Sequence, residues 1–178
     1  MGIKYYNSYF SISNEIVVNV QIIDIGGIVK YKVTNNTYYE KADCFLLVFD
    51  ITDKDSFIDC QNFYLEKIKE NCKKKYKILL IGNKIDLEGE RCVISQKGSI
   101  FAFENKCKYM ETSCFLNENV CEAFESVIDT TIIMNDDELK VDNYYDNYKK
   151  EENQKVIRPI DVNEQIVVFP KIMKFLNY

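Results

Sequence analysis

The sequence contains no histidine, and this absence excludes several kinds of enzyme. Ser-His-Asp and Cys-His catalysis, histidine proton shuttles and most catalytic zinc sites all need an imidazole. The seven cysteines are an odd number and form no CxxC pair. The N-terminus also lacks an apolar segment preceded by basic residues. We therefore expect reduced thiols and a cytoplasmic protein.

Long apolar runs and an excess of positive charge are missing as well. The longest apolar run is far below the roughly 18 to 20 residues that span a bilayer. A net charge of -5 argues against binding to the phosphate backbone of a nucleic acid. One lysine cluster, residues 73–77, is interpreted as a solvated helix end. With 178 residues and 47% hydrophobic content, the chain suits one domain plus an appendage.

Strands and helices alternate along the first part of the chain. Continuous apolar runs without alternation predict buried strands at residues 17–23, 44–49 and 77–82, and a shorter strand is predicted at 108–110. Apolar residues at helical spacing predict helices at residues 56–72, 95–105 and 118–134. Asp55 or Thr52 is the expected cap of the first helix. This order predicts an α/β fold, a doubly wound and mostly parallel sheet with helices on both faces.

The sequence divides near residue 134. Residues 1–134 carry the predicted sheet and helices, whereas residues 135–158 are dense in acidic, amide, lysine and tyrosine side chains and predict a polar linker. An apolar segment follows at Ile166–Phe169. We expect residues 135–178 to form a linker and tail, with the apolar segment either docked on the domain or presented to a partner.

Polar side chains follow each predicted strand. In a parallel sheet the carboxyl ends of the strands share one rim, and ligands bind there. Asn83, Lys84 and Asp86 follow the strand at 77–82, and this trio suits a guanine base. Asp86 can accept hydrogen bonds from N1 and N2, which guanine has and adenine lacks, Asn83 can brace the loop, and the stem of Lys84 can lie along the base. Alternatively, the tetrapeptide is only a turn that ends a strand.

Five motifs in order resemble the Ras superfamily of small GTPases, and more narrowly its Rab branch. The motifs are Asp24-Ile25-Gly26-Gly27 for DxxG, Tyr38-Tyr39-Glu40-Lys41-Ala42 for YYRGA, Val48 to Phe57 for VYDxTxxxSF, Asn83-Lys84-Ile85-Asp86 for the guanine motif, and Glu111-Thr112-Ser113-Cys114 for ETSA. The resemblance covers residues 2 to about 134. It implies binding of GTP or GDP with Mg²⁺, with Asn83, Lys84, Asp86, Ser113, Cys114 and Gly27 as nucleotide ligands and Asp24 on the metal side.

The resemblance also shows what the printed sequence lacks. The family's phosphate loop GxxxxGK[ST], whose backbone N–H groups cradle the phosphates, has no counterpart here. Gly2 to Tyr6 resembles the segment just after the switch I threonine, so we expect the first strand, the phosphate loop and that threonine to be absent. Loss of a central strand predicts a gap or an exposed edge in the sheet. Ile28 stands where the family has the glutamine that orients the attacking water, and an alkyl chain cannot do this.

These features predict a Rab-like, membrane-traffic type of guanine nucleotide-binding protein whose site is incomplete and which does not hydrolyse GTP. The resemblance implies effector or regulator partners at residues 28–39, and we expect a monomer that binds no nucleic acid. No cysteine lies beyond Cys121, so we expect no prenyl anchor. Either an upstream segment is missing from the sequence or the domain has decayed. A different class of function also stays open, a protein-interaction module that binds no nucleotide.

Overall fold

A six-stranded sheet forms the centre of the computed structural model, which describes residues 3–11, 17–26, 37–136 and 165–171. The strand order is β1-β2-β6-β3-β4-β5. The strands are β1 (Ile3–Ser11), β2 (Val17–Gly26), β3 (Cys44–Asp50), β4 (Lys77–Asn83), β5 (Lys108–Thr112) and β6 (Gln165–Lys171). Only the pairing of β1 with β2 is antiparallel among the described strands. The predicted, mostly parallel α/β sheet is therefore confirmed.

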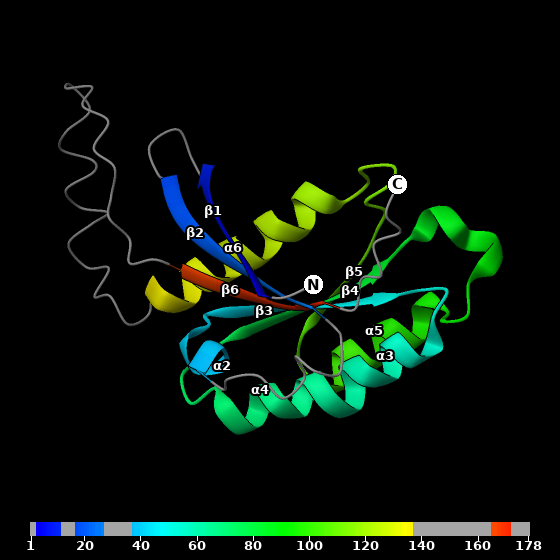
Figure 1. Ribbon diagram of the computed structural model, residues 1–178, viewed down its shortest axis with the longest axis horizontal. Coiled ribbons are helices and arrows are strands. Elements are labelled where there is room, and N and C mark those ends of the chain that lie inside the picture. Colours follow the sequence, from blue (N-terminus) through cyan, green and yellow to red (C-terminus); the bar gives the residue numbers. More distant parts are fainter. Residues whose placement is uncertain (1–2, 12–16, 27–36, 137–164, 172–178) are drawn as a thin grey trace.

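Helices cover both faces of this sheet. They are α2 (Thr37–Lys41), α3 (Lys54–Asp59), the π-helical turn η1 (Cys60–Tyr64), α4 (Leu65–Asn71), the 3-10 segment η2 (Ile85–Glu90), α5 (Ser95–Glu104) and α6 (Val120–Asp136). Figure 1 shows α6 on one side of the sheet and α3, α4 and α5 on the other. The buried residues form two clusters that match these two layers.

Strand β3 joins the two layers of the core. Its first six residues are all buried, as expected for a strand covered on both faces. Phe45, Leu47 and Phe49 belong to the cluster under α3, α4 and α5. Cys44, Leu46 and Val48 belong to the cluster under α6, whose own contribution is Ala123, Val127 and Ile128.

The predicted helix at residues 56–72 is present as α3, η1 and α4 in direct succession. Its cap is neither Asp55 nor Thr52 but Asp53, whose carboxylate accepts from the N–H groups of Asp55 at 3.0 Å and Ser56 at 3.4 Å. The correction follows from the backbone. Asp53 is still extended, with φ -126° and ψ 102°, and lies directly before the helix, which is the geometry of an N-cap.

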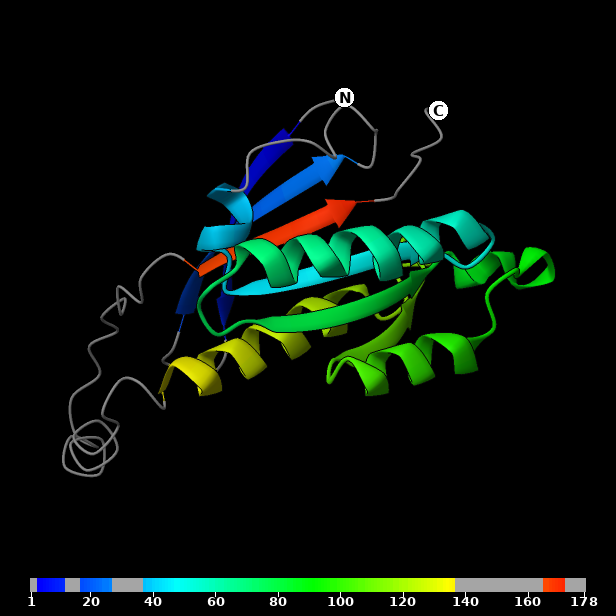
Figure 2. The same ribbon diagram turned by 90° about the horizontal axis from the view of Figure 1, so that it is seen from below.

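The expected gap in the sheet is not present among the described strands, and this prediction was wrong. Residues 165–171 form β6, which lies between β2 and β3 and runs parallel to both. Figure 2 shows β6, in red, beside β2 and above β3. The apolar segment at Ile166–Phe169 therefore supplies a central strand, and its backbone pairs with the edges that would otherwise be exposed.

Strand β1 was not predicted from the sequence at all. Its residues pair with β2 from Ile3↔Ile25 to Ser11↔Val17. Much of β1 is exposed, including Tyr5, Tyr6 and Tyr9, so it lacks the continuous apolar run by which the other strands were found. An edge strand needs only one neighbour, and for this reason its sequence signal is weak.

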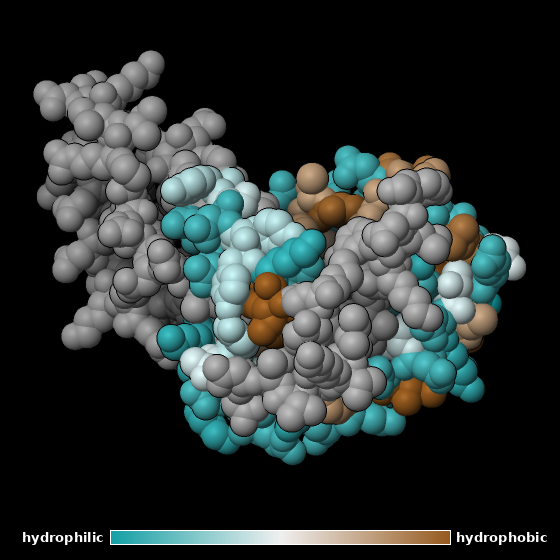
Figure 3. All heavy atoms as spheres, in the orientation of Figure 1, coloured by the Kyte–Doolittle hydropathy of each residue, from teal (hydrophilic) through white to brown (hydrophobic). Residues whose placement is uncertain are grey.

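Among the coloured residues of Figure 3, hydrophilic side chains predominate and apolar ones lie in small separate patches. Scattered apolar residues are normal on a protein surface. Within the described ranges, none of the helices combines the length and hydropathy required to cross a membrane.

Candidate functional site

Three polar residues lie side by side where β3, β4 and β5 end. The register pairs Asp50 with Asn83 and Asn83 with Thr112. The strands are parallel, so their carboxyl ends form one rim, as the sequence predicted. This rim carries the loops that begin at Lys84 and Ser113.

Asn83 connects two of these loops. Its side chain is buried, with 2% of its surface exposed, and Oδ1 accepts a hydrogen bond from the hydroxyl of Thr112 at 3.0 Å. The same oxygen accepts from the backbone N–H of Cys114 at 3.3 Å. Both donors come from the segment after β5. Asn83 therefore fixes the loop of β4 against the loop of β5, which is the bracing role predicted for it.

Lys84 forms an ion pair with Asp50, with Nζ and Oδ2 2.6 Å apart. Burial raises the pKa of the Asp50 carboxyl, but the ammonium of Lys84 and the two donors of Thr52 outweigh it and hold the pKa below its ordinary value. The backbone of Lys84 is left-handed, with φ 72° and ψ 38°. A non-glycine residue in this region is strained, and such strain often occurs at binding sites. The ammonium group of Lys84 is fixed by its ion pair with Asp50, so the methylene groups of the side chain lie along the rim.

Asp86 is held by Ser113 from the neighbouring loop. The Ser113 hydroxyl lies 2.5 Å from Oδ1 of Asp86, and it also accepts from the N–H of Leu116 at 3.0 Å. The loop closes on itself, because Ser113 and Glu118 exchange two backbone hydrogen bonds. Asp86 is half-buried and Ser113 is fully buried. The structure thus brings together Asn83, Lys84, Asp86, Ser113 and Cys114, five of the residues that the sequence singled out.

A second ion pair ties the same two segments together further from the rim. Arg91, just after η2, donates to both carboxylate oxygens of Glu111, at 2.8 and 3.1 Å. The hydroxyl of Tyr109 donates to Glu111 at 2.6 Å. Burial raises the pKa of Glu111, but Arg91 and Tyr109 outweigh it and hold the pKa below its ordinary value. This bidentate pair has geometric as well as electrostatic specificity.

Asp24 and Gly27 were predicted on the metal and phosphate side. Asp24 is half-buried in β2, where the register places it between Lys4 of β1 and Phe169 of β6. Gly27 lies outside the described residues. In the described part of the chain, histidine, cysteine and acidic side chains form no group of three or more that suits a metal ion. Asp24 stays a predicted ligand, and a single carboxylate is the usual protein share of a Mg²⁺ site that also holds phosphates and water.

The predicted partner surface at residues 28–39 is described only at its end. Residues 28–36, including Ile28, lie outside the described ranges. Tyr39 is buried, with 4% of its surface exposed, and packs in the core, so it is not available to a partner. Tyr38 is half-buried and its hydroxyl lies 2.5 Å from that of Tyr5 on β1.

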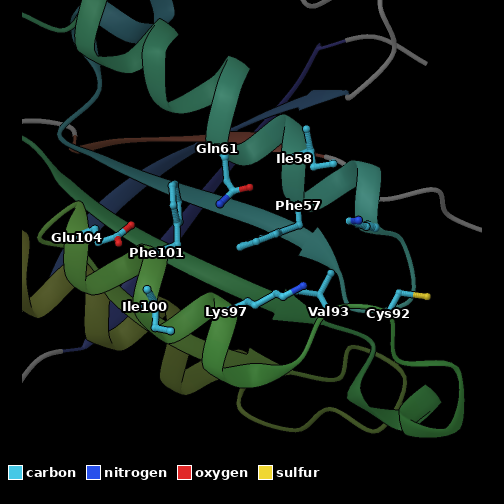
Figure 4. Close-up of a pocket in the computed structure, with 10 residues that line it drawn as sticks. Phe57, Ile58, Gln61, Cys92, Val93, Lys97, Ile100, Phe101 and Glu104 are labelled. Carbon is cyan, nitrogen blue, oxygen red and sulfur yellow. The ribbon is translucent and has the colours of Figure 1, made fainter.

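A pocket of about 280 Å³ lies elsewhere, between α3 and α5. Figure 4 shows Phe57 and Phe101 entering it from opposite helices, with Lys97 and Cys92 toward one end. None of the residues that line it belongs to the rim. It is therefore separate from the rim that carries Asn83, Lys84 and Asp86.

The sequence placed Asp50 and Thr112 at the rim without giving either a role there, and it did not indicate Arg91 at all. Asp50 ends the strand next to β4, so its pairing with Lys84 follows once the strand order is known. Thr112 lies within the ETSC motif, and its position opposite Asn83 needs the register of β4 and β5. Arg91 carries no sequence signal, because its partner is distant in the chain.

Comparison with known proteins places these motifs in a family. The model of the Ras family matches residues 1–133. Ras-related protein Rab-17 of Homo sapiens is 37% identical over 121 residues, covering 68% of this chain and 57% of that protein. Ras-related protein Rab-13 of Mesocricetus auratus is 37% identical over 110 residues, covering 62% and 54%. GTP-binding protein ypt3 of Schizosaccharomyces pombe is 33% identical over 128 residues, covering 72% and 59%.

The chain thus spans a little over half the length of the curated relatives it matches. The matched region contains all five motifs and five of the six strands. The chain belongs to the Ras family and is a Rab-like small GTPase homologue.

Proposed function

We propose that this chain is a Rab-like guanine nucleotide-binding domain in which the base-reading half of the site is formed and the phosphate-binding half is not. The observation that carries the proposal is the pair of loops joined by Asn83 and by the bond between Ser113 and Asp86. These bonds hold the Asp86 carboxylate in place before a ligand arrives. Preorganised acceptors lose less entropy on binding than free ones.

The base half fits guanine chemically. Ser113 donates to Oδ1 of Asp86, and in the proposed complex Oδ2 would accept from the N1 and N2 hydrogens of the base. The Cys114 amide points at Asn83 Oδ1 over 3.3 Å, a long hydrogen bond that can be shared with guanine O6. The apolar stem of Lys84, anchored on Asp50, supplies a surface for the ring.

The phosphate half does not fit the residues present. The printed sequence holds no GxxxxGK[ST], and residues 172–178, which follow β6 in the sequence, contain no glycine. The cation of Lys84 is committed to Asp50, and Asp24 adds another carboxylate near this edge. Phosphates would meet the Asp24 carboxylate there without the backbone cradle that the family's phosphate loop provides. We infer weak nucleotide binding for a chain of these residues alone, with little contribution from Mg²⁺.

Hydrolysis is not part of the proposed activity. Ile28 offers no hydrogen bond to a water nucleophile, and the groups that stabilise the transferring phosphoryl are not in the sequence. The domain would then act as a binding module of the membrane-traffic type, meeting effectors or regulators through residues 28–38. That cellular role is an analogy with the family and not a property of the geometry.

The test measures binding of the base and binding of the phosphates separately. Guanosine, adenosine and GTP, each with and without Mg²⁺, are titrated into the ¹⁵N-labelled chain and followed by amide chemical shifts. We expect guanosine alone to shift residues 83–86 and 113–114, and GTP to bind no more than a few times better than guanosine. Equal shifts with adenosine would contradict the base-reading half. Micromolar, Mg²⁺-dependent GTP binding would contradict the incomplete phosphate half.

A further inference from the structure

The centre of the sheet is made by a strand from the opposite end of the chain. Strand β6 pairs with β2 at seven positions, from Val20↔Gln165 to Gly26↔Lys171. It pairs with β3 at Cys44, Phe45 and Val48. Both neighbours are contributed by residues 17–50, and β6 is joined to α6 only through residues 137–164. Figures 1 and 2 both show β6 inserted between strands that precede it by more than a hundred positions.

The slot between β2 and β3 selects an apolar strand. On one face it is lined by Ile23, Ile25 and Phe45, which belong to the cluster under α3, α4 and α5. On the other face it is lined by Val20 and Leu46, which belong to the cluster under α6. A strand between two covered faces must be apolar at successive positions. The run Ile166-Val167-Val168-Phe169 has this pattern.

The occupant fits the slot imperfectly. Pro170 is paired with Ile25 and has no N–H to donate, although proline is normally confined to edge strands. Strand β6 pairs with β3 at Cys44, Phe45 and Val48, and the described pairs do not include Leu46 and Leu47, which lie opposite Phe169 and Pro170 in this register. Pairing with β3 is thus interrupted at Phe169 and Pro170, whereas pairing with β2 is continuous along β6. A strand with an ordinary residue in place of Pro170 would have one more donor.

We propose that the slot between β2 and β3 is a strand-binding site for an extended apolar peptide running parallel to both strands, and that residues 165–171 are its tethered, exchangeable occupant. Strand addition takes its affinity from main-chain hydrogen bonds and its specificity from alternating side-chain pockets. The tether keeps the local segment at a high effective concentration. A free peptide therefore displaces residues 165–171 only when its concentration is high or when it forms more hydrogen bonds with β2 and β3. This site is independent of nucleotide binding.

The experiment uses the whole chain with a protease recognition sequence placed between residues 137 and 164. After cleavage under native conditions, size-exclusion chromatography with mass spectrometry follows the released segment. We expect the segment to stay with the body. Fluorescent peptides are then added in excess: QIVVFPK, QIVVFVK and QIVPFPK. The first should displace the segment, the second should bind about fivefold more tightly because it gains one hydrogen bond, and the third should fail.

Several results would overturn the proposal. One is dissociation of the segment on cleavage with no peptide taken up, and another is a segment that no peptide displaces, since β6 would then be a permanent part of the fold. Equal binding of all three peptides would show non-specific adhesion. A second measurement uses the uncut chain and its midpoint of unfolding in denaturant. Val168→Pro should lower this midpoint, because Val168 pairs with both β2 and β3. Gln165→Pro, at the first position of β6, should change the midpoint little. Equal effects would count against β6 in the slot.

Discussion

The hydroxyl of Ser113 lies 2.5 Å from Oδ1 of Asp86, and this contact joins the loop after β5 to the loop after β4. It occupies one carboxylate oxygen and thereby orients the other. Ser113 is fully buried, so its position is set by the fold and not by solvent. Asp86, the predicted acceptor for a guanine base, is therefore held at the rim by a contact that the fold itself provides.

Replacing Asp86 with asparagine should remove the preference for guanosine over adenosine. The amide keeps an oxygen for the Ser113 hydroxyl, so the loops should stay in place, but its NH₂ group repels the guanine N1 and N2 donors. Losing a hydrogen bond to a charged group costs about 1.5 to 3 kcal/mol, or about 10- to 100-fold in affinity. Amide chemical shifts measured with both nucleosides check the result. Glu90→Gln, an exposed change in the same 3-10 segment, is the matched control and should keep the preference.

Replacing Asn83 with alanine should destabilise the fold. The change leaves the buried Thr112 hydroxyl and the Cys114 amide without their shared acceptor. Each stranded polar group costs about 1 to 3 kcal/mol, so a loss of about 2 to 4 kcal/mol in the free energy of unfolding is expected. Urea denaturation measures it. The exposed Asn62→Ala should stay within about 0.5 kcal/mol, and a similarly small loss for Asn83→Ala would show that Asn83 does not brace the loops.

The sequence was sufficient to predict the sheet class and the rim because those features are local. Strands β3 and β4 are continuous apolar runs, and parallel strands place their carboxyl ends together whatever the strand order. The guanine motif was interpreted from its position after β4 together with the order of four other motifs, and its role in base reading stays a prediction. The Asp53 cap was missed because Thr52, Asp53 and Asp55 stand close together around the start of α3, and only the backbone angles distinguish them.

The place of β6 could not be predicted in the same way. The apolar run at Ile166–Phe169 was visible, but nothing local says that it enters the middle of a sheet made by residues far away in the chain. Pro170 argued against a central strand. The ion pair between Arg91 and Glu111 could not be predicted either, because its two residues are brought together only by the fold. Local propensity determines which residues form a strand. The strands that pair with it are determined by the complete fold.

The Arg91–Glu111 pair should make stability depend on pH in the acid range. The pKa of Glu111 is lowered in the folded state from its ordinary value of 4.5, so its contribution is fully present above that value. It is lost as the pH falls below 4.5 and through the folded pKa, because the unfolded chain then binds the proton more readily. In Arg91→Met this part of the acid destabilisation should shrink, and stability at neutral pH should fall. Urea denaturation from pH 7 to pH 3 measures both.

The control for this titration is Lys69→Met. Lys69 pairs with Glu66 on the surface, where 47% and 54% of the two side chains are exposed. Exposed pairs of this kind contribute little, so its profile should follow that of the unchanged protein. Identical profiles for Arg91→Met and Lys69→Met would show that Glu111 is not stabilised by Arg91.

Replacing Gly98 with alanine should destabilise the protein although alanine favours helices. Gly98 lies within α5, and a Cβ there would come within 2.5 Å of ring carbon Cε2 of Tyr109. Alanine would gain about 1 kcal/mol in helix propensity, but overpacking against a ring costs about 1 to 3 kcal/mol. Tyr109 also bonds Glu111, so the ring cannot move without loosening the segment that carries Ser113. We expect a net loss of about 1 kcal/mol in the free energy of unfolding, measured by urea denaturation, and smaller guanosine-induced chemical shifts at Ser113.

The control is Gly89→Ala, whose Cβ would meet nothing within 4 Å. It should leave the free energy of unfolding and the guanosine-induced shifts unchanged. If Gly98→Ala instead raises stability, the contact between α5 and Tyr109 does not constrain the site.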